Sequence, residues 1–273
     1  MNTRLDREKI KENVINNCYD YTNGSFAYSM NNYYKVDNSK LKLLIVGTLT
    51  PNNGKGYYYT ALDNSGRGNR IDYNIYNYIN KANLGIEINI KEIANMLNLP
   101  DEEMDVNSPS NRMESNQYEN NKPIIEKINT LLNDAGIYFF DVFSSAIRKD
   151  KYNPSDSNIK VASLDYDNFK NIEINRCNII VNSREAFNRL KMLIQKDHPD
   201  YNGKIACVPQ LPRGFQPRYN PFIEDEINLI DVWTYMLNYG LNRECDSKKD
   251  YLNNFIVDYS KDAKWPYRTW NNI

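Results

Sequence analysis

A polar loop followed by a tyrosine cluster gives residues 43–59 (LLIVGTLTPNNGKGYYY) the most evident binding chemistry in this sequence. The first residues are apolar and β-branched, which predicts a buried parallel strand that ends at Gly47. The glycines and the proline that follow predict a loop at the carboxyl end of this strand, where open α/β sheets bind their ligands. Hydrogen-bonding groups beside the rings of Tyr57, Tyr58 and Tyr59 suit a planar ligand such as a nucleobase.

A single carboxylate, Asp141, interrupts the apolar run at residues 137–143 (IYFFDVF). The interior of a strand rarely holds a lone aspartate, because burying an unpaired charge is expensive. Asp141 should therefore lie either at the exposed end of the strand or at a position where its charge is used. Two structural roles also remain open for it, a helix N-cap and an ion pair with Arg148.

Alternating strands and helices would position these groups. Apolar runs predict strands at 42–47, 137–143, 178–181 and 205–208, and helical spacing predicts helices at 5–17, 73–79, 90–97, 124–132, 184–194 and 222–237. Polar stretches predict loops at 101–122, 146–160 and 209–221. The alternation predicts an α/β fold, a three-layer αβα sandwich with a short central parallel sheet of about four strands.

We expect one domain over residues 1–273, with a helical extension at the N-terminus (1–40) and a helical tail at the C-terminus (241–273). Four segments with chemical potential follow the predicted strands, at 47–59, 141–158, 182–184 and 209–218. They should form one cleft, because the carboxyl ends of parallel strands meet at one edge of a sheet. Within them, Asn182-Ser183 predicts the N-cap of the helix that follows.

A series of short motifs runs through residues 40–240: Gly47-Thr48-Leu49-Thr50-Pro51, Gly56-Tyr57-Tyr58-Tyr59, Asn69-Arg70, Gly136-Ile137, Asp141-Val142, Arg148-Lys149, Ser155-Asp156-Ser157-Asn158-Ile159, Val181-Asn182-Ser183 and a proline-rich loop from Val208 to Phe215. Their order resembles that of the uracil-DNA glycosylase superfamily, in particular the branch of mismatch-specific and hypoxanthine-type DNA glycosylases. Two departures stand out. Thr50 lies where the family usually has Asn or Asp before the proline, and the last loop has neither a catalytic His nor a Ser-Pro-Ala-Asn run.

The resemblance implies a monofunctional DNA glycosylase, which flips a damaged or modified base out of DNA and hydrolyses its N-glycosidic bond. It implies DNA as the partner (a duplex with a flipped base, or a single strand), no cofactor, no metal, and a monomer. The setting would be base excision in DNA repair or antiviral defence against phage DNA with modified bases. The departures keep a second hypothesis open, a catalytically inactive nucleic-acid-binding module of the same fold.

Carried onto this sequence, the resemblance assigns three groups of site residues. The catalytic group is Asp141, Thr50 and Asn52, with Asp141 facing the sugar and the other two positioning water or the base. The base-binding group is Gly47, Thr48, Tyr58, Tyr59 and Asn182. The DNA-binding group is Ser144, Ser145, Arg148, Ser155, Ser183, Arg213, Phe215 and Arg218.

The roles within the DNA-binding group differ. Serines near helix starts would bind phosphates with hydroxyl and amide donors. Phe215 would be a wedge inserted into the duplex. A tyrosine row packed on the sheet, and solvated arginines in an ordinary loop, are the structural alternatives for the aromatic and basic residues.

The charge of the chain does not indicate a nucleic-acid binder, since 34 basic and 35 acidic residues give a net charge of −1. A polyanion site would have to be local. Near-neutrality favours a third hypothesis, an α/β enzyme that acts on free nucleotides.

The remaining features indicate an ordinary intracellular protein. The four cysteines (18, 177, 207 and 245) lack metal-site spacing, so we expect buried reduced thiols. The sole histidine, His198, lies outside the motifs and is expected at the surface. No signal peptide and no apolar window of about 20 residues is present, which predicts a cytoplasmic protein without a membrane span.

Overall fold

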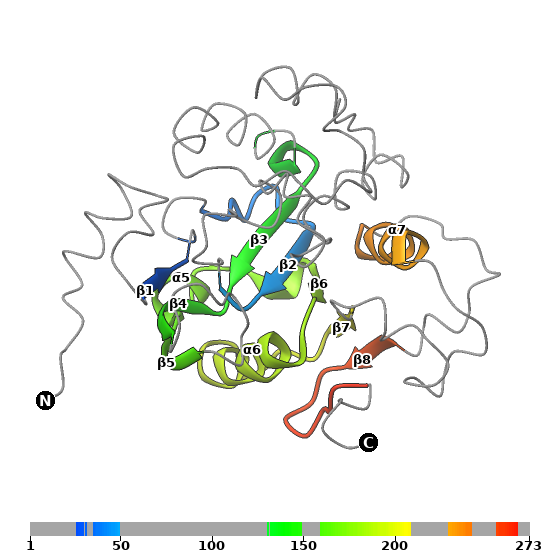
Figure 1. Ribbon diagram of the computed structural model, residues 1–273. Helices are drawn as coiled ribbons and strands as arrows, with labels where there is room; N and C mark the ends of the chain where they lie inside the picture. The colour runs from blue at the N-terminus through cyan, green and yellow to red at the C-terminus, as the bar shows by residue number, and fades with distance from the viewer. Residues whose placement is uncertain are drawn as a thin grey trace, which may run out of the picture.

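A five-stranded sheet of order β3-β2-β6-β7-β8 forms the centre of the computed structural model (Figure 1), which describes residues 26–29, 31, 35–49, 130, 132–148, 159–208, 229–241 and 255–266. Four strands are parallel: β2 (Leu43–Gly47), β3 (Ile137–Asp141), β6 (Asn178–Val181) and β7 (Lys204–Cys207). The outer strand β8 (Ile256–Asp258) is antiparallel to β7. The predicted α/β class with a central, mostly parallel sheet is confirmed.

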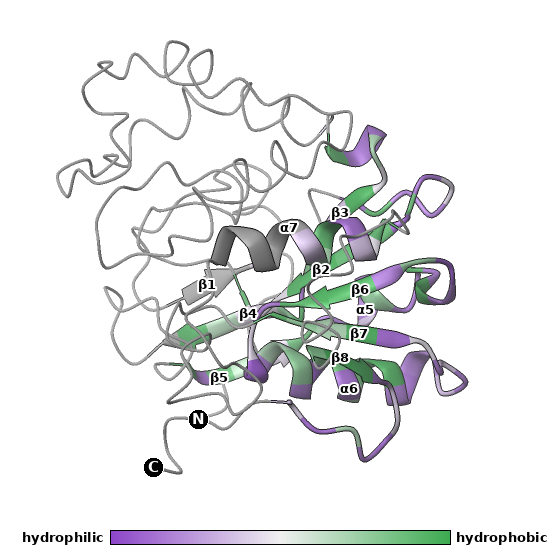
Figure 2. Ribbon diagram, turned by 90° about the vertical axis from the view of Figure 1, so that its right-hand side faces the viewer, coloured by the Kyte–Doolittle hydropathy of each residue, from purple (hydrophilic) through white to green (hydrophobic). Residues whose placement is uncertain are grey.

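Helices cover both faces of this sheet. The side chains of each strand alternate between the two faces, so one strand can contact helices on both sides. Leu44 belongs to the main core together with Phe187 of α6 (Arg184–Asp197). Leu43 points the other way, toward α7 (Leu229–Gly240), and a β-carbon at Gly240 would lie 2.6 Å from its Cδ1. Figure 1 shows α6 and α7 on opposite sides of the main sheet. Figure 2 shows that the strands between these two helices are mostly hydrophobic.

A second sheet of three antiparallel strands was not predicted. Its order is β1-β4-β5, with β1 (Phe26–Tyr28), β4 (Phe143–Arg148) and β5 (Ile159–Leu164). The loop predicted at 146–160 is therefore wrong at both ends, which belong to β4 and β5. The N-terminal extension, expected to be helical, contains the strand β1. The sequence of β4, FSSAIR, has little strand character of its own, so pairing with two distant segments decides its conformation.

Other predicted boundaries shifted. The C-terminal tail, expected to be helical, contributes β8, whose Val257 pairs with Ile205. Between β5 and β6 lie the short helix α5 (Tyr166–Phe169) and a 3-10 turn, η3 (Ile174–Arg176). The predicted helices at 5–17, 73–79 and 90–97 and the loop at 101–122 lie outside the described residues.

Two cysteines in the described residues have free thiols, and Cys207 is buried while Cys177 is partly buried. Burial raises the pKa of both thiols, that of Cys177 to about 12. Across the described ranges, no helix has the length and apolar character needed to cross a membrane.

Candidate functional site

Three strands end side by side at the carboxyl edge of the main sheet. Gly47 is the register partner of Asp141, and Val46 is the partner of Val181. The main-chain N–H of Asn182 donates to the Val46 carbonyl at 3.3 Å, so the parallel pairing continues one residue past β6. Asp141, Gly47 and Asn182 therefore form a row across β3, β2 and β6, which we call the edge row.

All three residues of the edge row lie on the α7 side of the sheet. The residues directly before them, Phe140, Val46 and Val181, belong to the main core on the α6 side. Side chains alternate along a strand, so each following residue points to the other face. β3, which carries Asp141, and β6, which precedes Asn182, lie on either side of β2 and about 10 Å apart. Gly47 has no side chain, so β2 places no side chain between the Asp141 carboxylate and the Asn182 amide.

The Asn182 side chain is fully buried, and neither its Oδ1 nor its Nδ2 has a hydrogen-bond partner among the described residues. The N-cap of α6 is Ser183, whose Oγ accepts a hydrogen bond from the Ala186 N–H at 3.1 Å. Of the two roles that the sequence left open for Asn182, the N-cap is therefore taken by its neighbour. A buried amide without partners costs about 1–3 kcal/mol, which a ligand that pairs with both of its atoms would recover.

Asp141 ends β3 and is fully buried, so the strand end that carries it is not exposed. A network of side chains holds its main chain. The Asn31 Oδ1 accepts from the Asp141 N–H at 2.9 Å, and the Asn31 Nδ2 donates to the Asp141 carbonyl at 2.7 Å. The same Nδ2 donates to Oδ2 of a second buried carboxylate, Asp165, at 2.8 Å.

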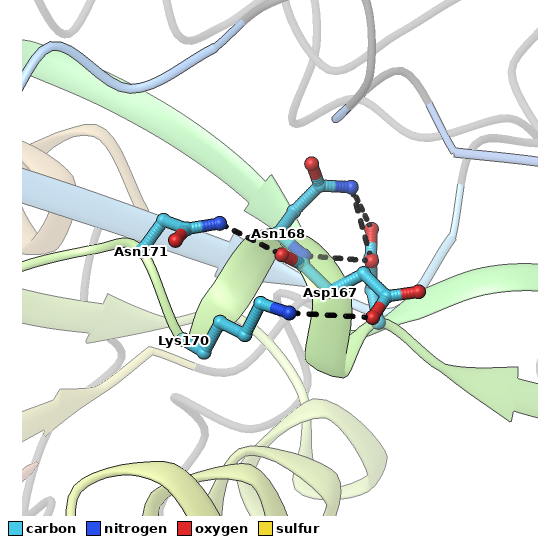
Figure 3. A network of polar contacts seen from close by, with 5 residues as sticks. Asp167, Asn168, Lys170 and Asn171 are labelled. Carbon is cyan, nitrogen blue, oxygen red and sulfur yellow. Dashed lines mark hydrogen bonds and ion pairs between the residues drawn. The ribbon is translucent and has the colours of Figure 1, made fainter.

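Asp165 is held in turn by Asn168, whose Nδ2 lies 3.0 and 2.9 Å from the two carboxylate oxygens and whose main-chain N–H lies 3.3 Å from Oδ1. Figure 3 shows the Asn168 amide turned away from the separate ion pair between Asp167 of α5 and Lys170, the C-cap residue of that helix. Sequence reasoning missed both Asn31 and Asp165. Asp165 had one available signal, an aspartate directly before a helix, and nothing local marks Asn31.

The serines of the β3–β4 region are not at helix starts. Ser144 and Ser145 lie within β4, where Ser144 Oγ donates to the Ser163 carbonyl at 3.2 Å and Ser145 is buried. This corrects the expectation that these two serines bind phosphate at helix N-termini. Thr48 follows the edge row directly and is buried, and its carbonyl accepts from the Phe143 N–H at 3.1 Å.

The other predicted site residues lie apart from this geometry. His198 is partly exposed, with Nε2 3.3 Å from the Phe169 carbonyl, at the C-terminal end of α6 and so at the opposite edge of the sheet. Arg148 ends β4, and its side chain is not described. Eight residues lie outside the described ranges, and their roles stay predictions: Thr50, Asn52, Tyr58, Tyr59, Ser155, Arg213, Phe215 and Arg218.

Within the ranges described, no group of three or more His, Cys, Asp or Glu side chains could hold a metal ion. Comparison with protein-family models, with curated proteins and with solved structures found no match to this chain. Any functional statement therefore depends on the chemistry of its own residues.

Proposed function

We propose that this protein is a monofunctional DNA glycosylase, which hydrolyses the N-glycosidic bond of a damaged or modified base flipped out of DNA. The edge row is the observation that supports the proposal most directly. It combines a buried carboxylate, a position without a side chain, and a buried amide on one face of a parallel sheet. The carboxyl edge is also where ligands of open α/β sheets bind.

The carboxylate suits the sugar side of the reaction. Breaking the bond between C1′ and the base nitrogen leaves positive charge on the sugar, as in glycoside hydrolysis. The Asp141 carboxylate would stabilise this charge and orient the water whose oxygen bonds to C1′. The water proton then passes to the carboxylate, and the bonding electron pair leaves with the base.

The amide suits the base side. Asn182 offers one acceptor and two donor hydrogens, which match a base edge that carries neighbouring donor and acceptor atoms. A donor fixed in place before the reaction also stabilises the negative charge that develops on the leaving base. A ligand paired with Asn182 would satisfy the two atoms that lack partners among the described residues.

The proposal is tested with oligonucleotides and phage DNAs that carry different natural, damaged and modified bases. Abasic sites are scored by alkaline cleavage. Asp141→Asn keeps the shape of the side chain and removes its charge, and we expect it to slow base release at least about 100-fold while DNA affinity is kept. The matched control is Asp200→Asn, an exposed aspartate in the turn before β7, which should leave release unchanged.

Each contrary outcome has a distinct meaning. Release at an unchanged rate by Asp141→Asn would remove Asp141 from the mechanism. A wild-type protein that binds DNA in a salt-sensitive manner but releases no base would be a binding module without catalysis. A protein that does neither would fit the hypothesis of an enzyme acting on free nucleotides.

A further inference from the structure

We infer that Asn31 is a positioning residue, which takes the place of a neighbouring strand on the outer side of β3 and thereby fixes the strand end that carries Asp141. The consequence for catalysis rests on the proposed function, but the positioning itself does not. The inference assigns part of the site to the N-terminal segment around β1, 110 residues before Asp141 in sequence.

The geometry of a parallel ladder explains why Asp141 needs such a partner. β3 is the outermost strand of the main sheet as described. The Val142 N–H donates to the Gly47 carbonyl on β2 at 3.0 Å. Peptide groups of successive residues point to opposite sides of a strand, so the N–H and C=O of Asp141 point away from β2.

The Asn31 amide supplies the acceptor and the donor that a neighbouring strand would offer to the outer side of β3. It offers one acceptor to the Asp141 N–H at 2.9 Å and one donor to the Asp141 carbonyl at 2.7 Å. Only one orientation of the amide satisfies both bonds. The second hydrogen of the same Nδ2 bonds the Asp165 carboxylate at 2.8 Å, and a bond to a charged acceptor is stronger than one between neutral groups.

Two main-chain hydrogen bonds hold Asn31 and Asp165, which we call the clamp, against the end of β3. The Ser29 N–H donates to the Ser144 carbonyl at 3.0 Å, which brings the chain after β1 beside β4. The Asp165 N–H donates to the Val142 carbonyl at 2.9 Å. Asn31 and Asp165 are both buried, so their bonds form away from water, where an unmade bond is costly. The junction between β3 and β4 is thus bonded both by the segment after β1 and by the segment after β5.

The first test measures positioning without any enzymatic activity. Amide hydrogen exchange is followed by NMR in the full-length protein and in Asn31→Ala. We expect the Asp141 N–H to lose protection at least about 10-fold relative to the Val142 N–H, whose bond to β2 is untouched, since exchange reports the opening of individual bonds. Equal changes at both amides, or none at either, would overturn the inference.

The chain offers a matched control in Asn38. Its Nδ2 donates to the Asn171 carbonyl at 2.7 Å, and its Oδ1 accepts from the Glu173 N–H at 2.9 Å, so it makes the same kind of two-bond clamp. It precedes β2 and so lies at the amino edge of the sheet, about 16 Å from the edge row. Asn38→Ala should leave the Asp141 amide unaffected.

The second test separates positioning from simple stability. Single-turnover base release and DNA affinity are measured for Asn31→Ala, Asn31→Asp and Asn38→Ala, each per folded molecule. A displaced strand end should slow release by about 10- to 100-fold in both Asn31 variants with little change in affinity, because small misplacements of a reacting group cost rate. Asn31→Asp keeps the acceptor but has no donor. A purely structural role would lower only the folded fraction.

The two proposals fail in different ways. If the wild-type protein releases no base, the proposed function fails, and hydrogen exchange still decides the role of Asn31. If release is normal in Asn31→Ala, the positioning role fails while the proposed function stands. Should the Asn31 variants not fold, Asp165→Asn removes the charged acceptor with little change of shape, and the same loss of protection at Asp141 is expected in it.

Discussion

The side-chain amide of Asn31 forms hydrogen bonds with both the N–H (2.9 Å) and the C=O (2.7 Å) of Asp141, a residue 110 positions further along the chain. A residue near the N-terminus therefore holds the end of the outermost strand of the main sheet. The amide of Asn182 on the same sheet edge contrasts with this, since it is equally buried but has no hydrogen-bond partner in the described part of the chain. One asparagine is bonded to the scaffold, and in the proposed function the other would pair with a ligand.

This contrast predicts opposite effects of the same substitution. Asn182→Leu should leave the free energy of unfolding unchanged or raise it by up to about 2 kcal/mol, because it removes a buried amide without partners. It should also abolish base release. Asn31→Leu should lower the free energy of unfolding by about 1–3 kcal/mol, because it removes a fully bonded amide. Urea denaturation of both variants checks the pair, and a large destabilisation by Asn182→Leu would contradict the assignment of that amide.

Gly47 should be sensitive to the addition of a single methyl group. Gly47→Ala would place a β-carbon between the carboxylate and the amide of the edge row. Alanine is favoured over glycine in a strand by about 0.5–1 kcal/mol, so the free energy of unfolding should not fall unless the space is filled by packing. Base release should nevertheless slow by about 10-fold or more. Rates and urea midpoints measured on the same preparation test this, and normal rates would show that no ligand occupies that space.

Gly136 should tolerate no side chain for a different reason. It adopts φ = 85° at the turn that leads into β3, and a β-carbon there would lie 2.6 Å from the Lys40 carbonyl oxygen. Gly136→Ala should lower the free energy of unfolding by about 1–3 kcal/mol. The exposed residue Asn202 serves as the control. Asn202→Ala should change the free energy of unfolding by less than about 0.5 kcal/mol. Equal stability of the two variants would contradict the backbone strain.

The thiols of Cys177 and Cys207 should be unreactive in the folded protein. Burial raises the pKa of Cys177 from 9.0 to about 12, so its thiolate fraction at neutral pH falls by about 1,000-fold. A variant with Cys18→Ser and Cys245→Ser, treated with a disulfide reagent, should react only after unfolding. Rapid labelling of the folded variant would contradict this.

The same pKa shift predicts how stability depends on pH. The folded state holds the thiol proton of Cys177 more tightly than the unfolded state, so its contribution to stability is complete below the unfolded pKa of 9.0. That contribution is lost as the pH rises toward about 12. Urea midpoints of the protein and of Cys177→Ala between pH 8 and pH 10.5 should therefore converge as the pH rises.

The sequence by itself determined the parallel strands and the place where they end. The runs at 43–46 and 179–181 are apolar on both faces, which is a local property of strands buried between two helical layers. Once these strands are parallel, Gly47, Asp141 and Asn182 must meet at one edge. The helix that follows β6 was also predicted, because Ser183 is a strong N-cap and buried residues recur along α6 at helical spacing.

Only the tertiary structure decided the second sheet, β8, and the clamp on Asp141. β4 contains two adjacent serines and becomes a strand because β1 and β5 pair with it on both sides. The bonds of Asn31 to Asp141 and Asp165 span 110 and 134 residues. No local pattern of hydrophobic residues records such contacts, since they arise when separate segments pack together and buried polar groups must find partners. The sequence thus indicated Asp141, and the fold decided which residues hold its main chain.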